Sequence, residues 1–278
     1  AESGVTRASL GVQDFDPTVQ KAIGRIQPIE TVERAVAALR GAGITAINFD
    51  LMYGLPHQTP ETIRRTIELT HRFGPSRIAL FGYAHVPWFK KHQRLIDEAS
   101  LPGANARFEL EQTARAALAE YGYEAIGLDH FALATDEMAV KAKSGELHRN
   151  FQGYTTDDAG TLIGLGCSSI GKTEQGFAQN DPDIGRWRKA VDAGRLPIAK
   201  GKALDDDDRL RADIIERVMC DYAVDVAQVC AAHGVGIDAV ADAFERLIEP
   251  ARDGLVVVDG EKITVTEEGR PLVRIVAA

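Results

Sequence analysis

Regular alternation of apolar and amphipathic stretches over the first 83 residues constrains the fold more than any other feature of the sequence. Three short apolar runs have the length and composition of β-strands, and two helical stretches separate them. The strands cover about residues 7–12, 44–51 and 77–83, and the helices residues 28–40 and 59–73. Strands joined by helical crossovers run parallel. We therefore expect an α/β fold whose ligands bind at the carboxyl ends of the strands.

Helix-end residues agree with this assignment. Pro28 is suited to the first position of one helix, and Thr59 is suited to cap the next one ahead of Pro60. A third amphipathic helix is expected from Asn105 to Tyr121, where Gly122 ends it.

The pattern changes at about residue 204. Three helical segments precede an apolar stretch that forms a hairpin across Asp259 and Gly260. The segments cover residues 205–221, 225–233 and 237–250, and the hairpin residues 255–266. Helices followed by a hairpin predict a winged-helix-like domain. We expect two domains, residues 1–203 and 204–278.

The C-terminal domain carries all of the net charge. Residues 205–278 hold 8 Lys/Arg against 17 Asp/Glu, which gives −9, whereas residues 1–204 hold 24 of each. A module this acidic repels a phosphate backbone, so we expect no nucleic-acid partner. The run Asp205–Asp208 is expected to cap a helix N-terminus.

Other composition signals narrow the class of protein. No apolar run approaches the roughly 18 residues of a membrane span, so we expect a cytoplasmic protein without a membrane partner. Cys167, Cys220 and Cys230 match no disulfide or metal-binding spacing, which predicts reduced thiols and no metal site in this chain. The opening residues 1–4 resemble a helix end, so we expect upstream sequence to be missing.

Polar residues at the expected strand ends are the candidate ligand-binding groups. Gln13 follows the first strand with a carboxamide that both donates and accepts, and Arg25 could bind a carboxylate in bidentate geometry. A structural role for Gln13 and a surface position for Arg25 are the alternatives. Asp50 ends an otherwise apolar run and needs a partner, because burying an unpaired carboxylate is costly. Its alternative is a strand-end aspartate that caps a turn.

Two further segments combine groups suited to ligand binding. In residues 83–87, backbone near Ala84 could contact a flat ring, while His85 is a ligand candidate or a satisfied, partly buried histidine. Residues 148–154 combine a cation, amides and aromatic rings on a turn-prone stretch, which suits an anionic macrocycle. A packed loop is equally compatible with that stretch.

The motifs occur in the order found in one enzyme family. They are SLGVQDF (9–15), DLMYGLP (50–56), YAHVP (83–87), GLDHFA (127–132) and HRNFQGYTT (148–156). With them the chain resembles the oxygen-independent coproporphyrinogen III oxidases of the radical S-adenosylmethionine (SAM) superfamily. The resemblance implies the C-terminal half of an incomplete (β/α)6 barrel followed by the small helical domain.

The resemblance also implies a reaction and its ligands. Two propionates of coproporphyrinogen III are oxidatively decarboxylated to give protoporphyrinogen IX in haem biosynthesis, without oxygen. Gln13, Arg25 and Asp50 match side chains that bind SAM, Ala84 and Ile170 match further contacts to a cosubstrate molecule, and Arg149 is the expected propionate-binding residue. We expect a monomer that takes electrons from a donor protein or another reductant.

One departure from the family changes the expectation for this chain. The family binds a [4Fe–4S] cluster through a Cys-x-x-x-Cys-x-x-Cys motif, which is absent from these 278 residues. We therefore expect the chain alone to be inactive. The alternative reading is the related haem chaperone of the superfamily, which has a different His-Asn and Tyr-Trp pattern where this chain has residues 148–156.

Overall fold

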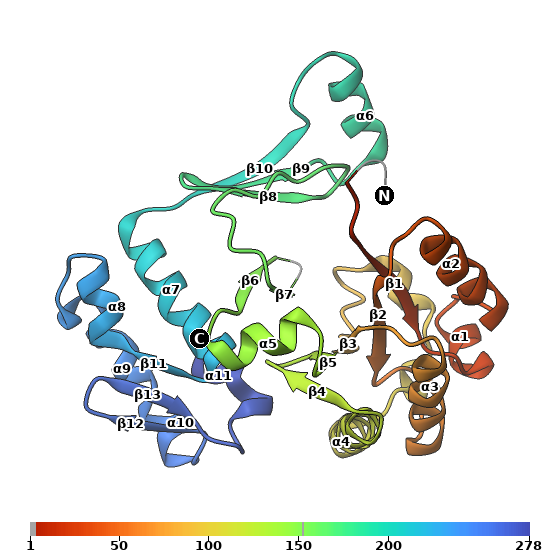
Figure 1. Cartoon of the computed structure of the whole chain (residues 1–278), viewed down its shortest axis with the longest axis horizontal. Helices are drawn as coiled ribbons and strands as arrows, with labels where there is room; N and C mark the ends of the chain where they lie inside the picture. The colour runs from red at the N-terminus through yellow and green to blue at the C-terminus, as the bar shows by residue number, and fades with distance from the viewer. Residues whose placement is uncertain (1–3, 152) are drawn as a thin grey trace. The chain divides into compact units, whose positions relative to one another are not determined.

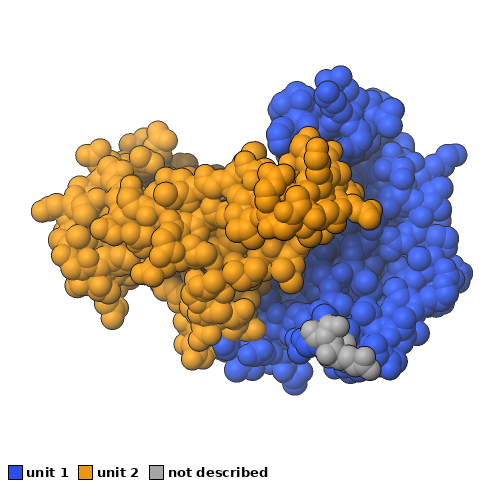
Figure 2. All heavy atoms as spheres, turned by 90° about the horizontal axis from the view of Figure 1, so that it is seen from above, with its two compact units in different colours: residues 1–143 blue, residues 144–278 orange. Residues whose placement is uncertain are grey.

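In the computed structural model, residues 4–151 and 153–278 are described, and they divide into two compact units (Figures 1 and 2). Unit 1 extends to Lys143, and unit 2 begins at Ser144. The motif residue Gln152 and the first three residues of the expected helix end, Ala1 to Ser3, lie outside the described residues. Among the described residues no helix combines the length and the apolar character needed to cross a membrane.

Unit 1 is built on a five-stranded sheet. The strands in sheet order are β1 (Arg7–Gln13), β2 (Ala46–Tyr53), β3 (Arg77–Gly82), β5 (His130–Leu133) and β4 (Tyr123–Ile126). The first three run parallel, as the sequence predicts. β5 then pairs antiparallel with both β3 and β4, an extension that the sequence analysis did not anticipate.

One face of this sheet is covered by α2 (Ile29–Gly41), α3 (Pro60–Arg72) and α4 (Ala104–Glu120) (Figure 1). Unit 1 also contains α1 (Pro17–Ala22), α5 (Glu137–Ser144) and the 3-10 turns η1 (Lys91–Leu95) and η2 (Glu98–Ser100). Apolar residues of α2, α3 and α4 pack against alternate strand residues such as Phe49 and Ile78, which are fully buried. Burial of this one face fixes the strand register, because a one-residue slip would expose the apolar set.

Two boundary predictions in unit 1 were wrong. The second strand covers residues 46–53 instead of 44–51. Pro28 is the N-cap of α2 and not its first helical residue, and it has extended backbone (φ −55°, ψ 148°). The prediction for α3 is confirmed, since Thr59 caps it in a reciprocal capping box and Pro60 opens it.

Unit 2 contains a hairpin and two small antiparallel sheets. The hairpin is β6 (His148–Asn150) and β7 (Gly153–Thr155). One sheet is β10 (Ile198–Ala203), β9 (Gly176–Asn180) and β8 (Ile170–Thr173), and the other is β11 (Ala223–Asp225), β13 (Lys262–Val265) and β12 (Val256–Asp259). The expected turn at Asp259 and Gly260 is confirmed, with Gly260 at φ +59°.

The helices of unit 2 lie mainly after residue 204. They are α6 (Ile184–Asp192), α7 (Asp206–Asp221), α8 (Val226–Ala232), α9 (Ala241–Arg246), α10 (Ile248–Arg252) and α11 (Val273–Val276), with the 3-10 turns η3 (Ile237–Val240) and η4 (Arg270–Leu272). Asp205 caps α7 through a capping box, which confirms the expected acidic cap. The predicted helix 237–250 is wrong, because the chain breaks into η3, α9 and α10. Pro250 has no N–H to donate and clashes with the carbonyl four residues earlier, which disfavours a continuous helix here.

Candidate functional site

The sheet of unit 1 presents a polar face opposite its helices. Gly11, Asp50, Ala79 and His130 are paired in register across β1, β2, β3 and β5, so their side-chain positions share one face. Ser9 and Asn48 are paired two residues earlier on the same face. Because the intervening residues pack under the helices, this face carries the groups that can contact a ligand.

Gln13 and Arg25 meet at the carboxyl end of β1. The pairing of β1 with β2 shifts between Gly11 and Gln13, and Gln13 has left-handed backbone with φ +67°. Arg25 follows α1, and its Nη2 donates to the Gly11 carbonyl oxygen at 2.6 Å. A Cβ atom at Gly11 would lie 2.9 Å from Gln13 Nε2 and 3.4 Å from Arg25 Nη2. Both side chains therefore lie directly over Gly11, which is paired with Asp50.

The carboxylate of Asp50, which lies in a mainly apolar strand, accepts hydrogen bonds from two neighbouring side chains. Ser9 Oγ donates to both carboxylate oxygens at 3.0 Å, and Asn48 Nδ2 donates to Oδ1 at 2.7 Å. Burial raises the pKa of Asp50, while these hydrogen bonds and the nearby His130 oppose the rise. The carboxylate is thus held in one orientation on the polar face.

Ala84 follows β3 at the same edge of the sheet. Gln93 Nε2 donates to the Ala84 carbonyl oxygen at 3.0 Å, and Val86 N donates to Gln93 Oε1 at 2.6 Å. One buried glutamine side chain therefore fixes the backbone on both sides of this loop. The Ala84 carbonyl oxygen accepts one hydrogen bond and keeps a second lone pair, so the backbone here can offer a ligand both an N–H and an acceptor.

His85 corresponds to the satisfied, partly buried histidine of the two alternatives. Its Nδ1 lies 3.0 Å from the Tyr83 hydroxyl, and its Nε2 lies 3.1 Å from Glu98 Oε1. Both ring nitrogens are therefore engaged within the loop.

Ile170 and Arg149 belong to unit 2, so their assignments stay predictions. Ile170 is the first residue of β8. Arg149 lies in β6 with its guanidinium 5.0 Å from the centre of the Tyr154 ring, and its Nε is buried without a hydrogen-bond partner. Together with Lys172 it lines a hollow of about 110 Å³.

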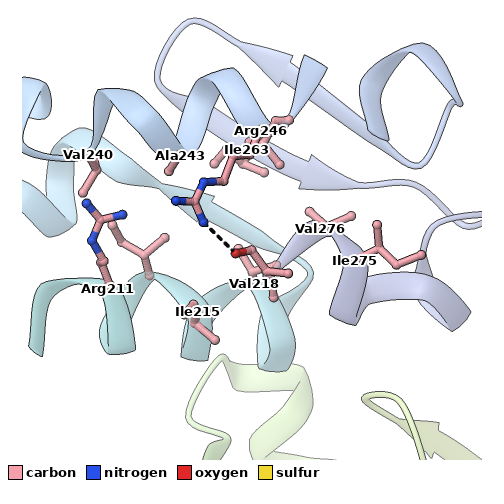
Figure 3. Close-up of a pocket in the computed structure, with 13 residues that line it drawn as sticks. Arg211, Ile215, Val218, Val240, Ala243, Arg246, Ile263, Ile275 and Val276 are labelled. Atoms are coloured by element: carbon pink, nitrogen blue, oxygen red, sulfur yellow. Dashed lines mark hydrogen bonds between the residues drawn. The ribbon is translucent and has the colours of Figure 1, made fainter. Parts of the chain in front are cut away.

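A second cavity in unit 2 is lined by no candidate site residue (Figure 3). Its volume is about 150 Å³, and its walls are mainly apolar side chains of α7, η3, α9, β13 and α11. Arg211 at its rim is held by Asp207 and Asp242, and Arg246 donates to the Ala278 carbonyl oxygen at 3.3 Å. Arg211 and Arg246 thus form their hydrogen bonds with other residues of the chain.

Metal ligands do not gather within residues 4–151 and 153–278, where no cluster of three His, Cys, Asp or Glu side chains could hold an ion. The three cysteines are free thiols, as expected. Cys220 and Cys230 are buried, and burial raises the pKa of Cys220 to about 12. A buried, protonated thiol is a poor metal ligand.

Three hydrogen-bonding residues of the site were missed from the sequence. They are Ser9, Asn48 and Gln58. The i, i+2 spacing of Asn48 and Asp50 within one strand is a signal that these two polar side chains share one face. Nothing in the sequence indicates that Gln58 reaches Asp14, because a contact 44 residues apart depends on tertiary packing.

Comparisons with known proteins agree with the resemblance seen in the motifs. The radical SAM superfamily model matches residues 1–70, and the HemN C-terminal domain model matches residues 204–272. An oxygen-independent coproporphyrinogen III oxidase from Bradyrhizobium diazoefficiens is 51% identical over 99% of this chain and 61% of its own length. One from Helicobacter pylori is 40% identical over 98% of this chain and 60% of its own length.

A solved structure extends the match to three dimensions. The chain superimposes on coproporphyrinogen III oxidase (HemN) from Escherichia coli, described as a radical SAM enzyme, with a TM-score of 0.91 and 38% identity. The match covers 99% of this chain and 64% of that one. The chain thus spans about three fifths of the length of these relatives. On its motifs, its fold and these matches, the chain is similar to the oxygen-independent coproporphyrinogen III oxidases of the radical SAM superfamily over about three fifths of their length.

Proposed function

We propose that the protein containing this chain converts coproporphyrinogen III to protoporphyrinogen IX by oxidative decarboxylation of two propionates, without oxygen, in haem biosynthesis. The meeting of Gln13 and Arg25 over Gly11, beside Asp50, carries the proposal. The names of the matched relatives support it.

The residues at the end of β1 fit SAM. Gln13 Oε1 is buried without a hydrogen-bond partner, so a ligand donor would satisfy an otherwise costly group. The absence of a side chain at Gly11 lets Gln13 Nε2 and Arg25 Nη2 lie close over its backbone. A carboxamide, a guanidinium and a carboxylate complement the hydroxyl, carboxylate and amino groups of SAM.

When bound, SAM supplies the oxidising equivalents of a radical reaction. Arg25 holds a carboxylate with the N–H groups that Gly11 does not use. Asp50 accepts from hydroxyl or amino groups, and Ser9 and Asn48 keep its carboxylate oriented. Ala84 offers its backbone, and Ile170 stays a contact that the resemblance alone implies. Gln13, Arg25, Asp50 and Ala84 bind and orient the ligand.

The chain's own residues do not fit the [4Fe–4S] cluster that the superfamily uses. Such a cluster needs closely spaced thiolates, whereas Cys167, Cys220 and Cys230 are far apart in sequence and two of them are buried. We therefore assign the cluster ligands to sequence outside these 278 residues and expect the chain alone to be inactive.

We also propose a barrel architecture and a domain boundary for this chain. Parallel β1, β2 and β3 with their crossover helices are the last strands of an incomplete (β/α)6 barrel. A boundary at residues 203 and 204 separates this barrel and its substrate-side elements from a winged-helix-like domain, and the range of the C-terminal domain model supports it. We further propose a cytoplasmic monomer that receives electrons from a donor protein or reductant.

Arg149 is our proposed propionate-binding residue. Its Nε is buried without a partner, and it lines a small hollow together with Lys172. A planar guanidinium suits a carboxylate in bidentate geometry. Glu216, which lines the same hollow, pairs with His148 at 2.6 Å and with Arg217 at 3.2 Å.

The test is an anaerobic assay of the full-length protein with reconstituted cluster, coproporphyrinogen III, SAM and a reductant, with protoporphyrin followed by chromatography. We expect product from the parent and from Asp238→Ala, a control at an exposed position. Asp50→Ala should lower the rate at least tenfold with its iron content unchanged.

Other outcomes would change the proposal. Stoichiometric haem binding without any product would favour the haem chaperone. Salt-sensitive retention of DNA in a gel shift would revive a nucleic-acid function for the acidic C-terminal region.

A further inference from the structure

Asp14 is a fully buried carboxylate directly after the proposed ligand Gln13. Its Oδ1 accepts from Asp16 N at 2.6 Å and from Thr66 Oγ1 at 2.9 Å, and its Oδ2 accepts from Gln58 Nε2 at 2.5 Å. Burial raises the pKa of Asp14, and these three hydrogen bonds oppose the rise. Three hydrogen bonds to one buried carboxylate hold the Asp14 side chain in a single orientation.

The backbone beside Asp14 is in an unfavourable conformation. Gln13 has φ +67°, a left-handed conformation uncommon for a residue with a side chain, and such residues persist only where their surroundings hold them. Asp14 N donates to the Val12 carbonyl at 2.9 Å, and Gln20 Nε2 donates to the Asp14 carbonyl at 2.9 Å. The turn that aims Gln13 over Gly11 is therefore held from both the backbone and the side chain of Asp14.

Gln58 cannot adapt to a change at Asp14. Its Oε1 accepts from Leu55 N at 2.9 Å, and its Nε2 donates to the Met52 carbonyl at 2.8 Å. These two contacts fix the orientation of the amide, so that Nε2 must face residue 14. Together with the bond from Gln58 to Asp14, these contacts tie the exit of β1 to the exit of β2.

We propose that Asp14 is a positioning residue of the SAM site, holding the left-handed turn at Gln13 and joining the ends of β1 and β2 through Gln58. This inference rests on the proposed function. Asp14 lies beneath the site and does not itself contact the ligand, so its loss should weaken binding by misplacing Gln13 and Arg25.

Asp14→Asn tests the proposal with little change in shape. The new amide can keep an oxygen toward Asp16 N and Thr66, but its N–H groups then face the donor Nε2 of Gln58. Asp136→Asn is the matched control, because Asp136 is also buried and bonded, to Arg77 Nε at 2.7 Å and Met138 N at 2.8 Å. Arg77 begins β3, so this control lies at the opposite end of the strands.

The measurements are equilibrium binding of SAM to the cluster-loaded, full-length protein and its urea unfolding midpoint. We expect Asp14→Asn to weaken SAM binding at least fivefold, with a matching rise in KM and a smaller change in kcat. Asp136→Asn should lower the unfolding midpoint while SAM binding stays within twofold. Equal SAM binding by the parent and Asp14→Asn would overturn the inference and leave the proposed function intact.

Two further outcomes complete the test. If Asp14→Asn does not fold, Thr66→Val tests the inference in its place, because valine keeps the shape of the side chain and removes one hydrogen-bond donor to Asp14. Unchanged SAM binding by Thr66→Val would reject the inference. A parent protein that binds no SAM would overturn the proposed function, and the positioning role with it.

Discussion

Gly11 lies beneath the two side chains that define the proposed SAM site. An added Cβ would meet Gln13 Nε2 at 2.9 Å, so the Gln13 side chain would have to move, and it would contact Arg25 Nη2 at 3.4 Å. We expect Gly11→Ala to weaken SAM binding by about tenfold, or roughly 1.4 kcal/mol, with little effect on unfolding. Equilibrium binding to the full-length, cluster-loaded protein measures this.

Gly103→Ala is the control for that variant. Gly103 caps α4 and would place its new Cβ in open space. Its SAM affinity should equal that of the parent. Unchanged affinity in both variants would mean that Gln13 and Arg25 tolerate displacement.

Asp50 gives a prediction about pH. Burial raises its folded-state pKa, so the folded state holds the proton more tightly than the unfolded chain does. The protonated Asp50 side chain therefore contributes fully to stability below the pKa of the unfolded chain, which is near 3.8. This contribution is lost as pH rises through the raised pKa of the folded state. The free energy of unfolding of the parent relative to Asp50→Asn should therefore decrease as pH rises through that window. Urea unfolding of both proteins between about pH 3.5 and 7 tests this.

Asp136 should show the opposite slope. Although burial raises its pKa, the Met138 N–H and Arg77 bring it below the usual value. Its contribution is then present above the unfolded pKa and lost as pH falls through the folded one. If the difference in unfolding free energy between parent and variant had the same slope for Asp50→Asn and Asp136→Asn, one of the two pKa assignments would be wrong.

At the scale of elements, the capping box of α3 is a source of stability visible in the sequence. Thr59 Oγ1 accepts from Thr62 N at 3.3 Å, and Thr62 Oγ1 accepts from Thr59 N at 2.9 Å. We expect Thr59→Ala to lower the free energy of unfolding by about 1 kcal/mol, measured by urea denaturation. Thr31→Ala is the control, because this exposed threonine lies inside α2 and its hydroxyl accepts from the Arg34 side chain at 3.1 Å. If Thr31→Ala lowered the free energy of unfolding as much as Thr59→Ala does, capping would not be the cause.

Elements were predictable where local signals agree. The Thr59 and Pro60 start of α3, the Asp205 cap of α7 and the turn at Gly260 all follow from short-range chemistry. Predicted boundaries were wrong where the same residue type is common at two neighbouring positions. Proline fits both a helix start and the residue before it, and Pro28 occupies the latter.

At the scale of the whole molecule, activity should require sequence beyond this chain. We expect the 278-residue chain, treated with iron and sulfide, to retain no cluster and to form no protoporphyrinogen in the anaerobic assay. Iron content and chromatography of the products measure the two parts of this prediction. Product from the chain alone would show that its own thiols can support the chemistry.

The sequence by itself determined the three parallel strands, the main helices, the absence of a local cysteine motif for a metal and the resemblance to one enzyme family. These depend on periodicity, capping residues and ordered motifs, which are local properties of the chain. Only the tertiary structure decided that Gln13 and Arg25 meet over Gly11, that Ser9 and Asn48 hold Asp50, and that Gln58 reaches Asp14. Those contacts join residues up to 44 positions apart, and strand register and helix packing bring such residues together, which no short stretch of sequence specifies.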